Sequence, residues 1–161
     1  MKYTQRVPSP IGELTLVAVG NQLTEIRFDN AGPVKGEAVE EETPVLAQTR
    51  QWLEIYFEGR DPGFLPDMAP EGSDFQKSVW KHIAKIPFGS TETYGSIAKK
   101  IAEERGIPRM AAQAVGGAVG ANPIPVIVPC HRVMGSGGKM TGYGGGIDKK
   151  MILLGIEGCF S

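Results

Sequence analysis

The stretch SDFQKSVWKHIAKIPFGSTETYGSIAKKIAEERGIPRMAAQAVGGAVGAN (residues 73–122) carries three helical patterns in a row and decides how the chain is organised. It opens with Ser73 and Gln76, an S-x-x-Q pair that can form a capping box at a helix N-terminus. Apolar residues then recur at helical spacing as far as the PFG sequence at residues 87–89. A helix is therefore predicted to begin here and to open a second domain.

Two more helices are predicted in the same stretch. One covers roughly residues 93–104 and is broken by the ERGIP sequence, and the next covers roughly residues 109–122. Two helices joined by a short turn in a basic segment have the outline of a helix-turn-helix. Many helical pairs share this outline, so on its own it does not assign DNA binding.

The third of these helices has almost no side-chain bulk. Its small residues are Ala111, Ala112, Ala114, Gly116, Gly117, Ala118 and Gly120. Each glycine inside a helix costs up to ~1 kcal/mol relative to alanine, so this composition needs a reason. Either another element of the protein or the groove of a nucleic acid approaches the helix closely, and composition leaves both readings open.

The first half of the chain is predicted to be a small sheet with one helix. Apolar and polar residues alternate over residues 14–28 around a Gly-Asn turn, which indicates a β-hairpin. The polar segment 31–42 is predicted to be a loop. Thr43 and Pro44 then predict the N-cap and the first position of a helix. Residues 59–73 contain three prolines and are predicted to be a linker.

The charge of the chain changes sign between the two halves. Residues 1–72 carry 6 Lys and Arg against 12 Asp and Glu, a net of −6, whereas residues 73–161 carry 11 against 6, a net of +5. This asymmetry favours a polyanionic partner for the second half, although two solvated surfaces of uneven charge would also produce it. We expect an α/β N-terminal domain over residues 1–72, with a small antiparallel sheet, a helix and the linker. A mostly helical, winged-helix-like domain with a helix-turn-helix is expected over residues 73–161.

The segment IPVIVPCHRVMGSGG (residues 124–138) places one of the two cysteines of the chain beside one of its two histidines. The preceding run NPIPVIVP (residues 122–129) is too short for a helix and is bounded by prolines, so it is predicted to be a short buried strand. Cys130 is then a small buried hydrophobe, a metal ligand or a nucleophile. A zinc site would have to recruit Cys159 and His82, and no pair has metal-ligand spacing, so no metal is expected.

A nucleophilic Cys130 requires a base or a cation that lowers the thiol pKa. His131 is adjacent, but neighbouring side chains on a regular strand point to opposite faces, so contact would need a turn or a bridging water. Glu157 lies near the end of a helix predicted to begin near Asp148, where the helix dipole disfavours a carboxylate. It could orient the imidazole, or it could be an ordinary solvated residue at a helix end.

These motifs resemble those of a known family. PCHRV (residues 129–133), with NPIP upstream and TGYGGG and LLGIEG downstream, resembles the O6-alkylguanine-DNA alkyltransferases, or methylated-DNA–protein-cysteine methyltransferases. The resemblance covers residues 73–161 and includes DFQKSVWKHIAKIPFGSTETYGSIA and AVGGAVGANP, while residues 1–72 are similar only in outline. It implies DNA repair by direct, stoichiometric transfer of an alkyl group from O6-alkylguanine to Cys130. The protein would be inactivated after one turnover and would use no cofactor, and O4-alkylthymine is a further candidate substrate.

The resemblance also implies roles for single residues. Cys130 matches the acceptor that attacks the alkyl carbon, His131 matches the base that deprotonates it through a water, and Glu157 matches the carboxylate that holds the histidine. The positions that match substrate-binding residues are Tyr94, which promotes nucleotide rotation and can supply a proton, Asn122, which ties the helix-turn-helix to the site, Val133, whose peptide binds the base, and Tyr143 of the binding loop.

Gly95 and Ser136 fall where the family contacts DNA, and Arg109 and Gln113 are two further candidate DNA-binding residues. Gln113 departs from the family pattern, which commonly has an arginine there that fills the gap left by the flipped base. Glutamine can still hydrogen-bond the orphaned base but supplies no cation and less stacking. Arg109, one turn earlier in the predicted helix, contributes charge from another place. The zinc ligands of some members are absent, because residues 1–72 contain no Cys or His.

The resulting expectation is a monomer that binds double-stranded DNA carrying O6-alkylguanine through the minor groove. No membrane segment is expected, because no apolar stretch approaches ~18 residues, and the protein is expected in the cytoplasm, on the nucleoid in a prokaryote, or in the nucleus in a eukaryote. Three alternatives stay open: a non-catalytic module that binds alkylated DNA, a Cys-His hydrolase, and a transcriptional regulator. The first is disfavoured by the presence of Cys130, the second has no recognisable oxyanion hole, and the third would more typically present polar and basic side chains on its recognition helix.

Overall fold

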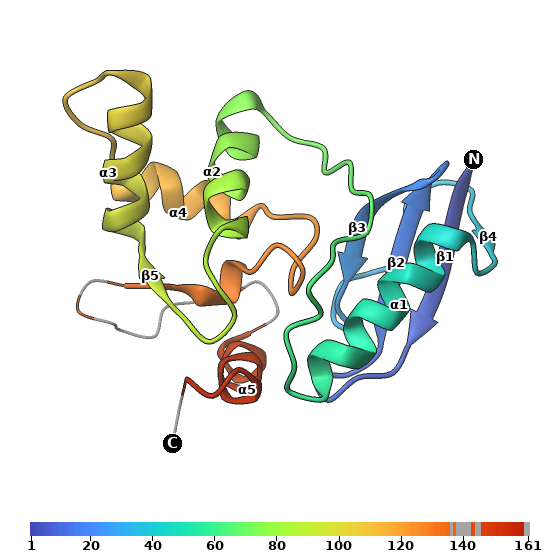
Figure 1. Cartoon of the computed structure of the whole chain (residues 1–161). Coiled ribbons are helices and arrows are strands. Elements are labelled where there is room, and N and C mark those ends of the chain that lie inside the picture. Colours follow the sequence, from blue (N-terminus) through green and yellow to red (C-terminus); the bar gives the residue numbers. More distant parts are fainter. Residues whose placement is uncertain (136, 138–142, 144–145, 160–161) are drawn as a thin grey trace. The chain divides into compact units, whose positions relative to one another are not determined.

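The computed structural model describes residues 1–135, 137, 143 and 146–159. The chain forms two compact units, Met1–Glu71 and Gly72–Ser161. Among the described residues, no helix has both the length and the apolar character needed to cross a bilayer. Each unit is described below by itself, with the elements labelled as in Figure 1.

The first unit is built on a four-stranded sheet in the order β3-β2-β1-β4. Its strands are β1 (Lys2–Val7), β2 (Leu14–Val19), β3 (Gln22–Arg27) and β4 (Val39–Glu40). The β2–β3 hairpin confirms the hairpin prediction, and Gly20 in its turn has a positive φ of 60°. Two details differ from the sequence prediction. β4 lies inside the predicted loop, and because it pairs parallel with β1 the sheet is mixed rather than purely antiparallel.

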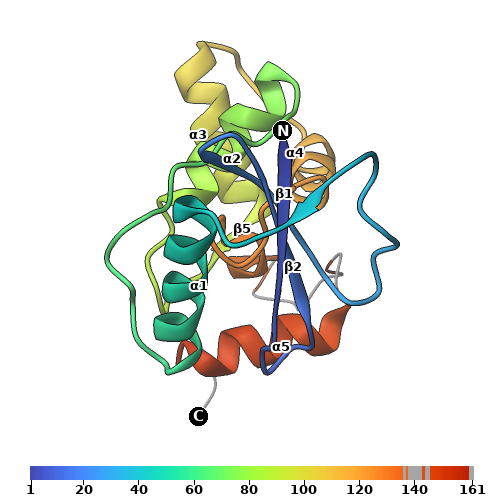
Figure 2. The same cartoon turned by 90° about the vertical axis from the view of Figure 1, so that its right-hand side faces the viewer.

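Helix α1 (Pro44–Phe57) lies along this sheet (Figures 1 and 2). The prediction for its start is confirmed, with Thr43 as N-cap and Pro44 in the first turn, although the Thr43 side chain makes no capping hydrogen bond. The core between helix and sheet consists of fully buried side chains, among them Leu14, Leu16, Leu23, Leu46 and Tyr56. Burial of each such side chain stabilises the fold by about 1.5–3 kcal/mol.

The segment predicted as a linker is partly ordered on the sheet. The N–H of Leu23 donates to the carbonyl oxygen of Asp67 at 2.8 Å, and the N–H of Ala69 donates to the carbonyl oxygen of Leu23 at 2.8 Å. These two bonds satisfy backbone groups on the outer edge of β3, which would otherwise be open to another chain. Residues 67–69 therefore belong structurally to the first unit.

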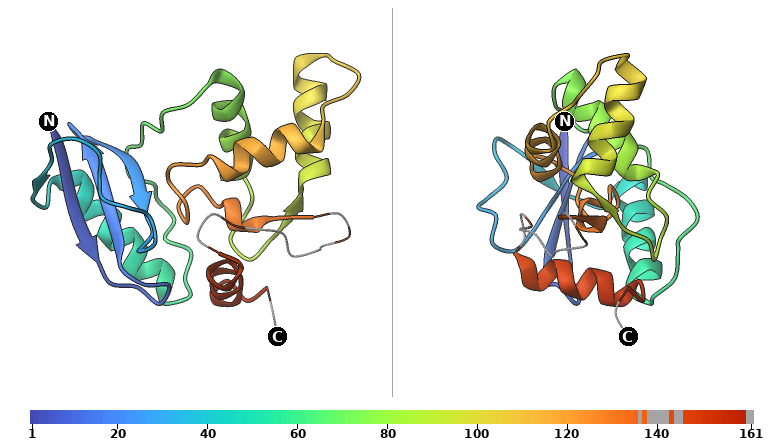
Figure 3. Two further views of the ribbon diagram at one scale, coloured as in Figure 1. Left: turned by 180° about the vertical axis from the view of Figure 1, so that it is seen from behind. Right: turned by 90° about the vertical axis from the view of Figure 1, so that its left-hand side faces the viewer.

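The second unit is mostly helical (Figure 3). Its elements are α2 (Asp74–Ala84), β5 (Glu92–Thr93), α3 (Tyr94–Arg105), α4 (Ala112–Gly120), the 3-10 turn η1 (Cys130–Arg132), β6 (Val133–Met134) and α5 (Ile147–Ile156). The capping box at the start of α2 is confirmed, since Ser73 and Gln76 bond each other's backbone N–H groups. Helices α2, α3 and α4 pack on one another through buried Val79, Ile83, Ile97, Ile101 and Val115.

Helices α3 and α4 form the predicted helix-turn-helix. Gly106 ends α3 in the left-handed conformation with φ of 65°, which glycine adopts without steric cost. Helix α4 begins at Ala112, three residues later than predicted, so Arg109 lies in the turn before the helix. The position of α4 is fixed from the inside by Trp80, whose indole N–H donates to the carbonyl oxygen of Ala118 at 2.8 Å.

The predicted strand over residues 122–129 is wrong, although the segment is buried as expected. Its backbone forms consecutive turns, and Val126 has a positive φ of 73°, which a β-branched residue rarely adopts. The Asn122 side chain closes these turns, because its amide donates to the carbonyl oxygen of Val128 at 2.8 Å and its oxygen accepts the N–H of Ile124 at 3.0 Å. The segment ends at Pro129, directly before Cys130.

Candidate active site

Cys130 opens the 3-10 turn η1, which is followed by β6. On a regular strand the side chains of Cys130 and His131 would point to opposite faces. The 3-10 turn removes this restriction, so the backbone has the turn that a contact between the two side chains requires. The N–H of Cys130 donates to the carbonyl oxygen of Val128 at 2.8 Å, and the side chain is buried, with 7% of the residue exposed. The cysteine is therefore held on a fixed backbone rather than on a loose loop.

Burial raises the pKa of the Cys130 thiol above its ordinary value. Hydrogen bonds from the Asn122 and Tyr143 side chains oppose this effect, and so does the positive charge of Lys150. Burial is the largest of these effects, so the thiol holds its proton more tightly than an exposed cysteine does. A thiolate formed at Cys130 would be stabilised by Asn122, Tyr143 and Lys150, each of which lowers the thiol pKa.

His131 is the candidate for a base that would deprotonate Cys130. Its Nε2 lies 2.5 Å from Oε2 of Glu157, and both side chains are completely buried. Burial lowers the pKa of His131, and the hydrogen bond and charge of Glu157 oppose that shift. In the neutral ring with Nε2–H directed at the carboxylate, Nδ1 is the nitrogen that accepts a proton. The pair has the base-and-orienting-carboxylate arrangement of nucleophilic enzymes.

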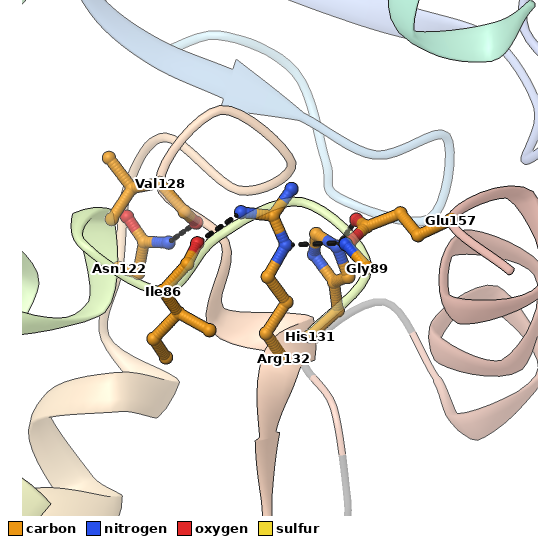
Figure 4. A network of polar contacts seen from close by, with 7 residues as sticks. All are labelled: Ile86, Gly89, Asn122, Val128, His131, Arg132 and Glu157. Atoms are coloured by element: carbon orange, nitrogen blue, oxygen red, sulfur yellow. Dashed lines mark hydrogen bonds and ion pairs between the residues drawn. The ribbon is translucent and has the colours of Figure 1, made fainter. Parts of the chain in front are cut away.

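Glu157 is the C-cap residue of α5 and is only 6% exposed, so the alternative of a solvated helix-end residue is excluded. Figure 4 shows its carboxylate between three donors. Its Oε1 accepts the Nε–H of Arg132 at 2.7 Å and the backbone N–H of Gly89 at 3.0 Å, while Oε2 meets His131. Arg132 in turn donates from Nη1 to the carbonyl oxygen of Ile86 at 2.6 Å. These bonds offset the cost of burying the carboxylate.

Lys150 is a site residue that sequence reasoning missed. It is fully buried, and its Nζ donates to the carbonyl oxygen of Val133 at 2.7 Å. Burial lowers the pKa of Lys150, while interaction with Cys130 raises it. A sequence signal was available, because Lys150 and Glu157 are seven residues apart near one helix and so lie on the same helical face.

Three of the four predicted substrate-binding residues surround the cysteine. Asn122 and Tyr143 lie close enough to Cys130 to lower the pKa of its thiol. Val133 follows η1 directly, and its carbonyl oxygen accepts the bond from Lys150. Tyr94, the fourth, is the first residue of α3 and comes directly after β5, which pairs in parallel with β6. The β5–β6 pairing thus links the start of α3 to the segment that follows Cys130.

A groove of about 480 Å³ lies where the starts of α3 and α4 meet. Its lining residues are Thr93, Tyr94, Gly95, Ala112, Gln113, Gly116 and Gly137. Of the predicted DNA-contacting residues, Gly95 and Gln113 are in this lining. Arg109 is exposed but does not line the groove, and Ser136 lies outside the described residues.

The outer face of α4 is smooth. Its exposed residues are Ala112, Gln113, Ala114, Gly117 and Gly120. A Cβ placed on Gly117 or Gly120 would meet no described atom within 4 Å, so no described element packs there. At Gly116 a Cβ would lie 3.9 Å from the Tyr94 ring. Packing against the described residues therefore does not explain Gly117 and Gly120.

No cluster of three or more His, Cys, Asp or Glu suited to a metal ion occurs in the part of the chain that the structure describes. Cys130 and Cys159 are both free thiols. The candidate site thus consists of a thiol, an imidazole, a carboxylate and two buried cations.

Two family profiles match the chain, one for each unit. Residues 74–159 match "6-O-methylguanine DNA methyltransferase, DNA binding domain", and residues 2–64 match "6-O-methylguanine DNA methyltransferase, ribonuclease-like domain". A Methanosarcina acetivorans protein named methylated-DNA–protein-cysteine methyltransferase is 47% identical over 154 residues, which cover 93% of this chain and 94% of that protein. A Haemophilus influenzae protein of the same name is 38% identical over 159 residues, which cover 96% of this chain and 86% of that one.

Solved structures agree with these relatives. The crystal structure of Mycobacterium tuberculosis OGT in complex with DNA superposes with a TM-score of 0.83 at 42% identity. The superposition covers 96% of this chain and 92% of that one. The M. tuberculosis O6-methylguanine methyltransferase gives a TM-score of 0.84, also at 42% identity, over 98% of this chain and 93% of that chain.

Proposed function

The chain belongs to the 6-O-methylguanine DNA methyltransferase family, which repairs DNA by transferring an alkyl group to a cysteine, and on this premise we propose that Cys130 is the acceptor and O6-alkylguanine in duplex DNA the substrate. The activity is that of a methylated-DNA–protein-cysteine S-methyltransferase. The observation that carries the assignment of Cys130 is its place beside a buried His131 that is bound to Glu157. Residues 73–161 hold all of this machinery, and residues 1–72 form the N-terminal domain.

The chemical step follows from the site. The Cys130 proton passes through a water to Nδ1 of His131, and Glu157 stabilises the imidazolium that forms. The thiolate attacks the alkyl carbon in line, the new S–C bond forms as the C–O6 bond breaks, and the electron pair of that bond leaves with guanine. Tyr94 supplies a proton to the leaving base, and the proton that His131 took from Cys130 is returned through solvent to restore Tyr94. The thioether is stable, so the protein is consumed in one turnover.

The reactive carbon is reached only if the nucleotide leaves the base stack, because the O6 atom lies inside the duplex. The smooth face of α4 fits the narrow minor groove, where bulky side chains would clash. The net charge of +5 over residues 73–161 attracts the phosphates and predicts affinity that falls with salt. We propose that the protein acts as a monomer. Its expected location is that of the DNA, which is the cytoplasm in a prokaryote and the nucleus in a eukaryote.

Three alternatives fit the molecule less well. A non-catalytic module would have no use for a buried thiol with a base beside it. A Cys-His hydrolase is disfavoured because residues 74–159 match the DNA-binding domain of the 6-O-methylguanine DNA methyltransferases. A transcriptional regulator reads bases with long polar side chains, and on the exposed face of α4 only Gln113 is of that kind.

Mass spectrometry tests the proposed function. After incubation with duplex DNA containing O6-methylguanine, we expect the intact protein to gain the mass of one methyl group, and the peptide that contains Cys130 to carry it. A Cys159→Ala variant should take up methyl as the wild type does, and Cys130→Ala provides the negative control. An unchanged wild-type mass, or methyl on Cys159, would refute the assignment.

Gln113 gives a second prediction, which concerns base flipping. It lies in the groove between the starts of α3 and α4, and a Gln113→Arg variant would add a cation and a longer side chain there. We expect faster repair of duplex DNA, by about threefold to tenfold (~0.7–1.4 kcal/mol), with little change in the reaction with free O6-benzylguanine. Single-turnover rates on the two substrates measure this, and equal changes on both would rule out a flipping role.

A further inference from the structure

Glu157 has two basic partners, of which the proposed mechanism uses only one. Its Oε2 meets Nε2 of His131 at 2.5 Å, and its Oε1 meets Nε of Arg132 at 2.7 Å. The side chains of His131 and Glu157 are completely buried, and that of Arg132 is 9% exposed. Each carboxylate oxygen therefore serves one basic side chain in a site from which water is largely excluded.

We propose that Arg132 is a positioning residue that keeps His131 neutral, and so able to accept a proton, by balancing the charge of Glu157. The proposal rests on the proposed function of the site and assigns to Arg132 a part in the same reaction. It is a statement about the resting protein, so it can be tested without any alkyl transfer.

The physical reason is the net charge of the buried group. With Arg132 and Glu157 both ionised, a neutral His131 leaves the three side chains with no net charge. Protonation of His131 would give them a charge of +1, close to the further cation Lys150, and a buried net charge is costly. Without Arg132, the ionised Glu157 would be balanced only if His131 took up a proton. Removal of the arginine charge is therefore expected to raise the pKa of His131.

The charged and titratable groups that face this site are consistent with that sign. Burial lowers the pKa of His131, Glu157 raises it, and the charges of Arg132 and Lys150 lower it further. Lys150 interacts with the thiol of Cys130, and Cys159 interacts with both Glu157 and Arg132. Glu157 is the one carboxylate among these groups, and Arg132 is its direct cationic partner. Loss of Arg132 would therefore leave the charge of Glu157 to act on His131 alone.

The surroundings of Arg132 hold the guanidinium in place for this task. Its Nη1 donates to the carbonyl oxygen of Ile86 at 2.6 Å, and its Cζ lies 5.9 Å from the centre of the Phe88 ring. The same turn supplies the Gly89 N–H that donates to Oε1 of Glu157 at 3.0 Å. Arg132 and Glu157 are thus fixed to one backbone segment, and the planar fork of arginine suits this arrangement better than lysine would.

The direct test is an NMR titration of the His131 ring in the full-length, unalkylated protein. The chain has only two histidines, so a His82→Gln variant assigns the signals. We expect wild-type His131 to be neutral at pH 7, and its titration midpoint to rise by about one pH unit or more in Arg132→Met. Arg132→Lys, which keeps the charge, should stay closer to the wild type than to Arg132→Met. A wild-type His131 that is charged at pH 7, or equal midpoints in the three proteins, would overturn the proposal.

Kinetics provide a readout that a merely structural role would not move. His131 acts when deprotonated, so the rate falls as the pH drops through its pKa. A raised pKa shifts this acid limb to higher pH, which lowers the rate of Arg132→Met by about tenfold per unit on that limb and restores it at higher pH. A uniform loss at every pH would contradict the proposal. If the wild type transfers no methyl at all, the proposed function fails, while the NMR titration still decides the role of Arg132.

Discussion

A Glu157→Gln variant is expected to transfer a methyl group about 10²–10⁴ times more slowly than the wild type at neutral pH, which is the range that a positioned acid or base contributes. The neutral amide cannot stabilise the imidazolium that His131 becomes when it takes the thiol proton. Its two ends also differ, so it cannot accept bonds from both Arg132 and His131 as the carboxylate does. Deprotonation of Cys130 loses its driving force, and the thiol pKa should rise further.

The same substitution is expected to destabilise the second unit. Arg132 would keep its charge in a nearly buried position without an anion, and breaking such a buried pair costs about 3–5 kcal/mol. Single-turnover methyl transfer, thiol reactivity against pH and thermal unfolding measure the three effects. Glu103→Gln, which changes an exposed carboxylate on α3, is the matched control. A folded Glu157→Gln protein that repairs DNA at the wild-type rate would show that the carboxylate has no part in catalysis.

Local sequence patterns predicted the helices well, because the signals that start and end a helix lie within a few residues of its ends. The capping box of Ser73 and Gln76 and the Thr43-Pro44 pair are of this kind. Residues 122–129 show that such local signals do not always predict the backbone conformation. Their apolar character predicted burial correctly, but their backbone follows the two hydrogen bonds of the Asn122 side chain, which a strand pattern does not contain.

In the site, too, some features could be predicted from the sequence and others could not. Cys130, His131 and Glu157 are predicted from the resemblance to the family, and Lys150 could have been added from its seven-residue spacing to Glu157. The contacts of Glu157 with Gly89 and of Arg132 with Ile86 join residues 68 and 46 positions apart. Only the packing of α2, η1 and α5 brings these groups together, so no local pattern could have predicted them.

A Gly117→Glu variant is expected to lose about 100-fold (~2.7 kcal/mol) in its rate on duplex DNA at low substrate concentration. Gly117 is on the smooth exposed face of α4, and no described atom lies within 4 Å of a Cβ built there. Glutamate also has a better helix propensity than glycine, so the fold should not suffer. In the minor groove, however, its side chain would collide with the groove walls, and its charge would be repelled by the phosphates on both sides.

The design separates DNA binding from chemistry. Free O6-benzylguanine needs no groove, so Gly117→Glu should react with it at close to the wild-type rate, because the substitution leaves Cys130, His131 and Glu157 untouched. Gly117→Ala is the matched control: it adds only a methyl group and should repair duplex DNA almost as the wild type does. If Gly117→Glu repairs duplex DNA normally, α4 does not enter the groove, and its glycines need another explanation. If both substrates react slowly, the substitution has disturbed the site itself, and the smooth face is not a separate DNA-binding surface.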